Sequence, residues 1–264
     1  MGEEKRFLVA VGLRNLPFPI RAISKVSSTG QQTIANISIT ARIMSEFETH
    51  CIDTLIRILH THRDELTAGN LQAIILDYLR ELRAERVEID FEYPFFVEKR
   101  TPVSREKCLV KYTCYHSVKA PSIESATKTT FAIEIPAITT YPAPHMEKTW
   151  GLFGQLSKAR IELITKTEVY PEDLVEIVDR HALVPVYSYL TDEDQLFLMR
   201  KAHTEQKTSV VMTNEIRDDL ALKREIEWYS VVCFNYGMIH SYSTLVGTEK
   251  NTWGPFSGYE GTDL

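Results

Sequence analysis

One histidine near the carboxyl end of the chain has a side chain that could do chemistry. His240 follows a predicted strand and lies close in sequence to Asn235, Tyr236 and Tyr242. An imidazole gains and loses a proton near neutral pH, so His240 can serve as a general acid or base. The alternative is a histidine kept for a structural hydrogen bond, and the residues alone leave both interpretations open.

The cysteines and the other histidines do not form a metal-binding pattern. The four cysteines are spread along the chain without a Cys-x-x-Cys pair, which indicates neither a zinc cage nor a disulfide framework. His60 and His62 lie two residues apart on a predicted helix. They point about 200° away from each other and cannot share an ion. Reduced, unpaired cysteines lead us to expect a cytoplasmic protein.

Length and charge exclude several classes of protein. The chain has 264 residues, of which 44% are hydrophobic and 25% charged, so it is a globular protein with one large or two small domains. Its 30 basic and 36 acidic residues give a net charge of −6, whereas nucleic-acid binding requires a basic surface. No apolar run reaches the roughly 18 residues of a membrane span. We therefore expect a small-molecule substrate as the partner, with no nucleic acid and no membrane.

Hydrophobic periodicity predicts an α+β order in the first half of the chain. Alternating residues indicate strands, and apolar residues at helical spacing indicate two helices in between. The first helix opens with a capping box formed by Ser45 and Glu48, and the second begins at Asn70. The predicted strands are 7–11, 33–40, 87–93, 109–118 and 127–135, with turns at 17–19 and 27–30.

A similar order repeats from about Thr140, with Pro171 in the first turn of a helix. The further predicted elements are strands at 157–169, 226–235 and 243–248 and helices at 192–204 and 213–222. Two ββααββ-like halves predict a duplicated α+β fold in which helices cover one face of antiparallel sheets. We place an N-terminal module at 1–138 and a C-terminal module, ending in a loose Gly-rich tail, at 139–264.

Six segments, in a fixed order, resemble the metal-dependent GTP cyclohydrolase IB family, whose members open the guanine ring at the head of folate and methanopterin synthesis. The most specific segment is 93–104, which resembles the family's F-P-Y-F-x-x-K and A-P-V-S motifs. The others are 11–20, 30–35, 44–47, 186–190 and 235–240. The resemblance implies two tandem tunnelling-fold modules, assembled as a homo-oligomer (dimer or tetramer) with sites at subunit junctions.

The resemblance also locates the family's metal ligands, and this chain differs at most of them. The family's two cysteines correspond to Tyr141 and Ala143, its first histidine to Phe153 and its glutamate to Pro185. Only His240 remains of the ligand set. Tyr, Phe and Pro do not supply the thiolate, imidazole or carboxylate donors that a divalent ion needs. We therefore expect no metal, no other cofactor, and no hydrolysis of GTP by the family's metal-dependent route.

A substrate pocket follows from the same resemblance. The glutamate that anchors the substrate in the tunnelling fold corresponds by counting to Arg200, which would favour an anionic group. Alternatively, Arg200 is a solvated helix residue, and Tyr141 merely fills the space of a lost metal site. The expected catalytic residues are His240, Tyr141 and Tyr242, and the expected substrate-binding residues are Arg200, Gln155 and Tyr187.

Three functions are compatible with these residues. The first is a repurposed, metal-independent enzyme, such as a cyclase, lyase or hydrolase, acting on a small anionic heterocycle or an amino-acid-derived substrate. The second is a catalytically inactive homologue that binds a metabolite or a partner protein. The third is an unconventional GTP cyclohydrolase in folate or pterin biosynthesis. We favour an enzyme, and among the three we favour the first.

Overall fold

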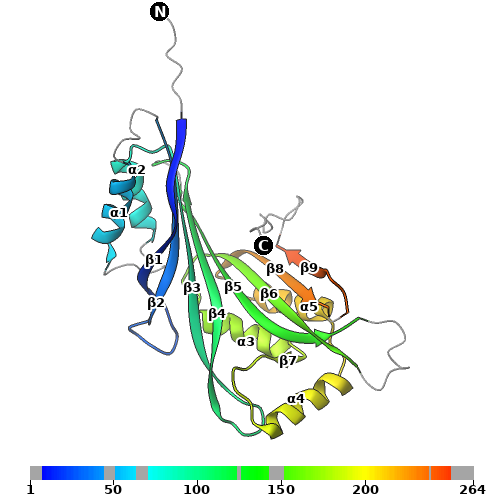
Figure 1. Cartoon of the computed structure of the whole chain (residues 1–264). Helices are drawn as coiled ribbons and strands as arrows, with labels where there is room; N and C mark the ends of the chain where they lie inside the picture. The colour runs from blue at the N-terminus through cyan, green and yellow to red at the C-terminus, as the bar shows by residue number, and fades with distance from the viewer. Residues whose placement is uncertain are drawn as a thin grey trace, which may run out of the picture. The chain divides into compact units, whose positions relative to one another are not determined.

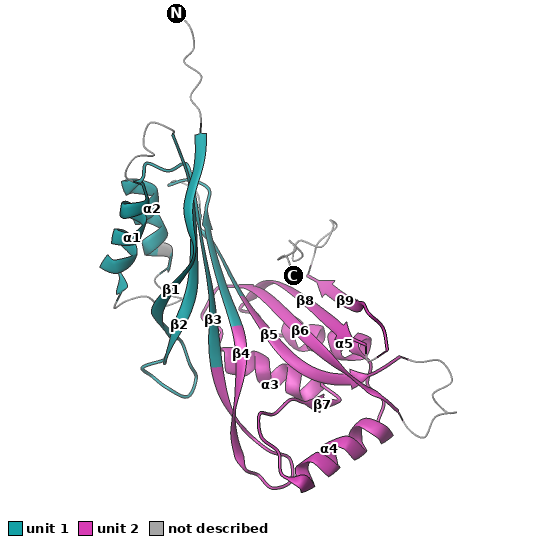
Figure 2. Ribbon diagram, in the orientation of Figure 1, with its two compact units in different colours: residues 1–95, 114–131 teal, residues 96–113, 132–264 magenta. Residues whose placement is uncertain are grey.

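The computed structural model describes residues 8–44, 51–63, 71–123, 126–142, 152–237 and 239–250 (Figure 1). These residues form nine strands and five helices in the order ββααββ followed by ββαβααββ. The chain divides into two compact units, residues 1–95 with 114–131 and residues 96–113 with 132–264 (Figure 2). The predicted α+β duplication is therefore visible in the order of the elements.

In unit 1, the first two strands form a long antiparallel hairpin. β1 (Leu8–Ala22) pairs with β2 (Gln31–Met44), and the turn closes where the Gly30 N–H donates to the Ser27 carbonyl oxygen at 2.9 Å. The turn predicted at 17–19 is wrong, because Pro17 and Pro19 lie within β1. A strand tolerates proline where no ladder hydrogen bond is lost, and β1 stands at the end of the strand order.

Two helices cover one face of this hairpin (Figure 1). They are α1 (Cys51–Thr61) and α2 (Leu71–Glu81), followed by β3 (Arg86–Arg100) and β4 (Lys107–Ala120). The apolar stripe predicted for the second helix is buried at Ile74, Ile75 and Leu79. Within the same buried layer, the Tyr78 hydroxyl donates to the Leu55 carbonyl oxygen at 2.8 Å. The capping box at Ser45 and Glu48 lies outside the described residues.

The remaining elements build most of unit 2. They are β5 (Lys128–Thr140), β6 (Gly154–Thr165), α3 (Pro171–His181), β7 (Val184–Pro185), α4 (Asp192–Thr204), α5 (Ser209–Ala221), β8 (Ile226–Tyr236) and β9 (Ser243–Glu249). Pro171 occupies the first turn of α3, as predicted. Helix α5 begins before the predicted Thr213 because Thr208 caps it, accepting from the Val211 N–H at 3.4 Å.

The second run of elements begins with β5 at Lys128, before the predicted boundary at 138/139, and unit 1 ends inside β5 at residue 131. The boundary stays a prediction. β8 pairs with both β6 and β9, and α5 packs against β8 and β9. The buried side chains of this layer include Ile161, Val231, Met212 and Ile216. The predicted C-terminal tail lies outside the described residues.

All four cysteines are buried. Burial raises the pKa of the Cys233 thiol to about 12, so this thiol is neutral and unreactive in the fold. Among the helices of the described ranges, none combines the length and apolar character that crossing a bilayer requires.

A buried carboxylate fixes the start of α4. Asp194 Oδ1 accepts from the N–H groups of Val103 and Ser104 at 2.8 and 3.0 Å, and its Oδ2 accepts from the hydroxyls of Ser104 and Thr191 at 2.6 and 2.8 Å. Burial alone would raise the pKa of Asp194, but these hydrogen bonds outweigh it and hold the pKa well below its usual range. The 101–104 segment is thereby fastened to α4.

Candidate functional site

Three aromatic rings gather where β5 and β8 end. His240 follows β8, and its ring stacks on that of Tyr242 with centroids 4.9 Å apart and an interplanar angle of 16°. Tyr141 follows β5, and its ring lies 6.4 Å from that of His240 at 29°. The structure thus brings together the three residues that we expected to be catalytic. We call Tyr141, His240 and Tyr242 the ring cluster.

Backbone contacts hold the ring cluster at the strand ends. The Tyr141 N–H donates to the Phe153 carbonyl oxygen at 2.7 Å, which joins the end of β5 to the start of β6. A Cβ atom at Gly237 would lie 3.6 Å from Tyr141 Cε2 and 3.9 Å from His240 Cδ2. Gly237 therefore lies against both rings, and its missing side chain leaves a methyl-sized space between them.

The ring cluster is open to solvent on its outer side. Tyr242 is 60% exposed, His240 is also exposed, and Tyr141 is half-buried. An exposed aromatic face can stack on a planar heterocycle, and an accessible imidazole can exchange a proton with a bound molecule. The arrangement can therefore combine stacking with proton transfer.

A chain of buried hydroxyl and amide groups lies next to the ring cluster. Ser157 Oγ donates to Asn235 Oδ1 at 2.8 Å and lies 2.8 Å from Thr139 Oγ1, while Asn235 Nδ2 donates to Ser209 Oγ at 3.0 Å. Gln155 Nε2 joins the chain by donating to Thr139 Oγ1 at 3.3 Å. Gln155 is thus 3% exposed and hydrogen-bonded inside the fold, and its expected contact with substrate stays a prediction.

Tyr187 belongs to a different group of side chains. The Lys99 ammonium lies 4.6 Å from the centroid of the Tyr187 ring, 2.6 Å from Asp179 Oδ2, and donates to the Val186 carbonyl oxygen at 2.9 Å. Burial raises the pKa values of both Asp179 and Tyr187, and Lys99 partly offsets the shift at Asp179. Lys99, at the end of the resembling segment 93–99, therefore anchors the 186–187 backbone. The expected contact of Tyr187 with substrate stays a prediction.

The structure does not bring Arg200 to the ring cluster. Leu198 is buried in the packing of α4, and Ala202 Cβ lies 3.8 Å from where a Cβ of Gly154 would be. Arg200 is two residues from each and so points to the opposite, exposed face of α4. Within the described ranges, its guanidinium has no hydrogen bond or ion pair. Its expected role in substrate binding stays a prediction.

The resemblance assigns Tyr141, Phe153 and Pro185 to three of the family's metal-ligand positions, and the expected loss of the metal ligands stays a prediction. Tyr and Phe are not customary ligands of a divalent ion, and Pro185 on β7, which pairs with Ala137 on β5, offers no donor side chain. In the part of the chain that the structure describes, no three His, Cys, Asp or Glu side chains are arranged to hold a metal ion. His240 alone offers a customary metal donor in this set.

Known proteins resemble the chain over most of its length. The family described as type I GTP cyclohydrolase FolE2 matches residues 3–245. The GTP cyclohydrolase FolE2 of Geotalea uraniireducens (strain Rf4) is 29% identical over 241 residues, which cover 91% of this chain and 88% of that protein. The GTP cyclohydrolase FolE2 of Thermosipho africanus (strain TCF52B) is 24% identical and covers 92% of both chains.

Solved structures resemble the fold. A uricase from Bacillus fastidious has a TM-score of 0.59 at 11% identity and covers 92% of this chain and 93% of that one. The uricase from Arthrobacter globiformis has a TM-score of 0.53 at 8% identity and covers 98% and 99%. The predicted α+β fold of two tandem tunnelling-fold modules is confirmed.

Proposed function

The chain belongs to the type I GTP cyclohydrolase FolE2 family, and we propose that it is an unconventional GTP cyclohydrolase, a hydrolase that opens the guanine ring of GTP in folate or pterin biosynthesis. The match to this family over residues 3–245 is the observation that carries the proposal. This match favours an unconventional GTP cyclohydrolase over a repurposed, metal-independent enzyme with another substrate. Our expectation that the chain is not a metal-dependent GTP cyclohydrolase conflicts in part with this membership. We therefore propose that the chain hydrolyses GTP, but without the family's metal ligands.

The ring cluster supplies the groups that such a hydrolysis needs. The exposed face of Tyr242 stacks on the planar purine, and His240 accepts a proton from the attacking water as its oxygen bonds to the ring carbon. The carbon–nitrogen double bond becomes single, and His240 returns the proton to that nitrogen. The new hydroxyl then passes its proton by way of His240 to the second ring nitrogen as the bond from the carbon to that nitrogen breaks, which leaves a formamide. A second water attacks the formamide carbon, the remaining carbon–nitrogen bond breaks, and the carbon leaves as formate while the nitrogen takes up a proton as an amine.

A second candidate is a metal-independent hydrolase, cyclase or lyase that uses the same ring cluster on another small anionic heterocycle or amino-acid-derived substrate. Tyr141, Phe153 and Pro185 at the positions of three family ligands favour this alternative. A thermal-shift screen with anionic metabolites tests it. A stabilising metabolite that Tyr242→Ala no longer recognises would support it, and no stabilisation by any metabolite would leave an inactive homologue.

Formate release from GTP tests the main proposal. We expect the purified full chain to release formate in proportion to the GTP consumed. Ile239→Ala should not change the rate, because Ile239 is adjacent to His240 but 74% exposed and outside the ring cluster. Absence of formate, with or without added zinc or manganese, would refute the proposal and favour the second candidate.

We also propose that the chain assembles as a homo-oligomer through β9, which stands at the end of the strand order. β9 carries neither proline nor lysine, which are the usual protections of an edge strand. Exposed apolar side chains lie on and beside this strand. They are Leu245 on β9 and two residues that pair with each other, Leu156 on β6 and Tyr236 on β8, and each is 44–53% exposed. Light scattering should give a mass of two or four times 30.3 kDa, and Leu245→Lys should lower it. A wild-type mass of 30.3 kDa would contradict assembly.

A further inference from the structure

We propose that Lys207 and Glu215 form a positioning pair that sets the place of Tyr141 in the ring cluster. The link to GTP rests on the proposed function, whereas the link to Tyr141 is structural. Neither residue lies in a segment that resembles the family, and neither belongs to the ring cluster. Lys207 is in the connection between α4 and α5, and Glu215 is on α5.

The backbone of Lys207 holds the residue before Tyr141. The Thr140 N–H donates to the Lys207 carbonyl oxygen at 2.7 Å, and the Lys207 N–H donates to Thr140 Oγ1 at 2.7 Å. Thr140 is fully buried. These two short hydrogen bonds fasten the end of β5 to the α4–α5 connection, so a shift of Lys207 moves the point from which the Tyr141 side chain projects.

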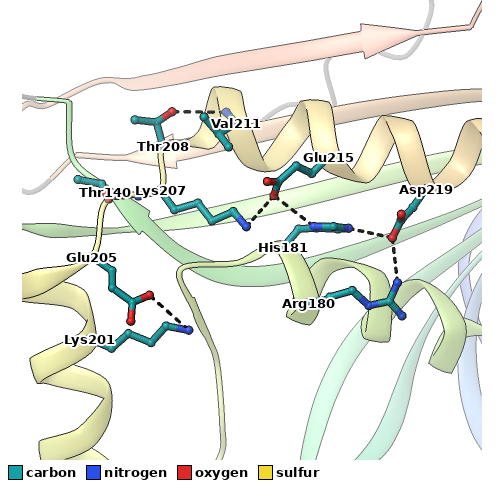
Figure 3. Close-up of polar contacts among 10 residues, drawn as sticks. All are labelled: Thr140, Arg180, His181, Lys201, Glu205, Lys207, Thr208, Val211, Glu215 and Asp219. Atoms are coloured by element: carbon teal, nitrogen blue, oxygen red, sulfur yellow. Dashed lines mark hydrogen bonds and ion pairs between the residues drawn. The ribbon is translucent and has the colours of Figure 1, made fainter.

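The side chain of Lys207 fixes its backbone in turn. Figure 3 shows it extending from the connection to Glu215, with Nζ 2.6 Å from Glu215 Oε2. The Lys207 and Glu215 side chains are 23% and 38% exposed, so solvent screens this pair only in part. The ammonium is therefore paired inside the chain, and its role is to hold the connection in place.

Glu215 is itself held by a wider charge network. Its Oε2 also lies 3.2 Å from His181 Nδ1, and His181 Nε2 lies 2.8 Å from Asp219 Oδ2, which accepts from Arg180 at 3.0 Å (Figure 3). These residues join the end of α3 to α5. Glu215 is thus oriented from one side by α3 and bonds the α4–α5 connection on the other.

A second Lys–Glu pair in Figure 3 serves as a control for the Lys207–Glu215 pair. Lys201 and Glu205 form a second Lys–Glu pair, with Nζ and Oε2 3.9 Å apart and four residues apart along the end of α4 (Figure 3). Its carboxylate partner is 58% exposed, against 38% for Glu215. The Lys201–Glu205 pair is therefore more exposed and longer than the Lys207–Glu215 pair, and it joins α4 to the first residue after that helix, whereas the Lys207–Glu215 pair reaches α5.

The test compares Lys207→Met, Glu215→Gln and Lys207→Arg with Lys201→Met, all in the full chain. Amide hydrogen exchange is measured at Thr140 and Tyr141, and the affinity for GTP is measured by titration. We expect Lys207→Met and Glu215→Gln to speed exchange at Thr140 by about 5-fold and to weaken GTP binding by a similar factor, with an unchanged Tm. Lys207→Arg, which keeps the charge, should restore both values to within about twofold, and Lys201→Met should change neither.

Two results would overturn the proposal. The first is exchange at Thr140 that is the same in Lys207→Met as in Lys201→Met. The second is faster exchange throughout the chain with a fall in Tm, which would make the pair a general stabilising contact. If wild-type protein fails to bind GTP, the proposed function fails, and exchange at Thr140 still decides the positioning role.

Discussion

Replacing His240 with glutamine should lower kcat for formate release from GTP by about 10²–10⁴-fold, the usual contribution of a general acid–base group. Glutamine keeps hydrogen-bonding capacity and similar size but cannot exchange a proton near neutral pH. KM should change by less than about threefold, because the stacking face of Tyr242 remains. The measurement is steady-state formate release at saturating GTP, for the variant and the wild type at equal concentration.

Ile239→Ala is the control, because it changes the adjacent, exposed residue and leaves the ring cluster intact. Tyr242→Leu supplies the complementary result, a raised KM with a smaller loss in kcat, since it removes stacking and keeps the imidazole. A kcat for the His240 variant within about threefold of the wild-type value would assign His240 to a structural hydrogen bond.

Replacing Asp194 with alanine should lower Tm by roughly 5 °C or more. The change removes one carboxylate that accepts from Val103, Ser104 and Thr191, and it leaves the buried N–H groups of the 101–104 segment without their partner. Differential scanning calorimetry of the full chain measures the effect. Asp192→Ala is the matched control, since Asp192 is in the same helical turn but exposed, and its loss should lower Tm by about 1–3 °C at most.

The pH dependence of this effect has a defined sign. The folded-state pKa of Asp194 is depressed, so the unfolded state binds its proton at a higher pH than the folded state. The charged carboxylate therefore stabilises the fold fully above its unfolded pKa of about 4, and this contribution is lost as the pH falls below that value. The Tm difference between wild type and Asp194→Asn should be constant from pH 8 to 5 and shrink below pH 4. A constant difference down to pH 2 would contradict the depressed pKa.

Much of the fold is predictable from local pattern, because a strong periodicity is a property of the element itself. Helix α4 has the predicted bounds Asp192–Thr204, and the stripe of α2 is buried as its spacing indicates. The wrong predictions occur where a residue distant in the sequence determines the local structure. Pro17 and Pro19 continue β1 because β2 lies alongside, and β7, at two residues, is too short to show any period.

Less of the candidate site could be predicted. The ring cluster could be predicted from the resemblance at 235–240 and from the position of Tyr141. Motifs that keep their order along the chain also keep the same strand ends together in the fold. The contacts that support the ring cluster join residues far apart in the sequence, such as Thr140 with Lys207. Ser157 and Asn235 have the residue types of a polar surface, and only the pairing of β6 with β8 makes them a buried pair.

Formate release from GTP after removal of metal is the measurement that tests the central claim most directly. The full chain is dialysed against EDTA until it holds less than about 0.05 zinc or manganese ions per chain, and the rate is compared with that of untreated protein. Because the resemblance assigns Tyr141, Phe153 and Pro185 to three of the family's ligand positions, we expect formate release at a rate within about twofold of the untreated value. A rate that falls to background after EDTA and returns with added zinc or manganese would contradict the account.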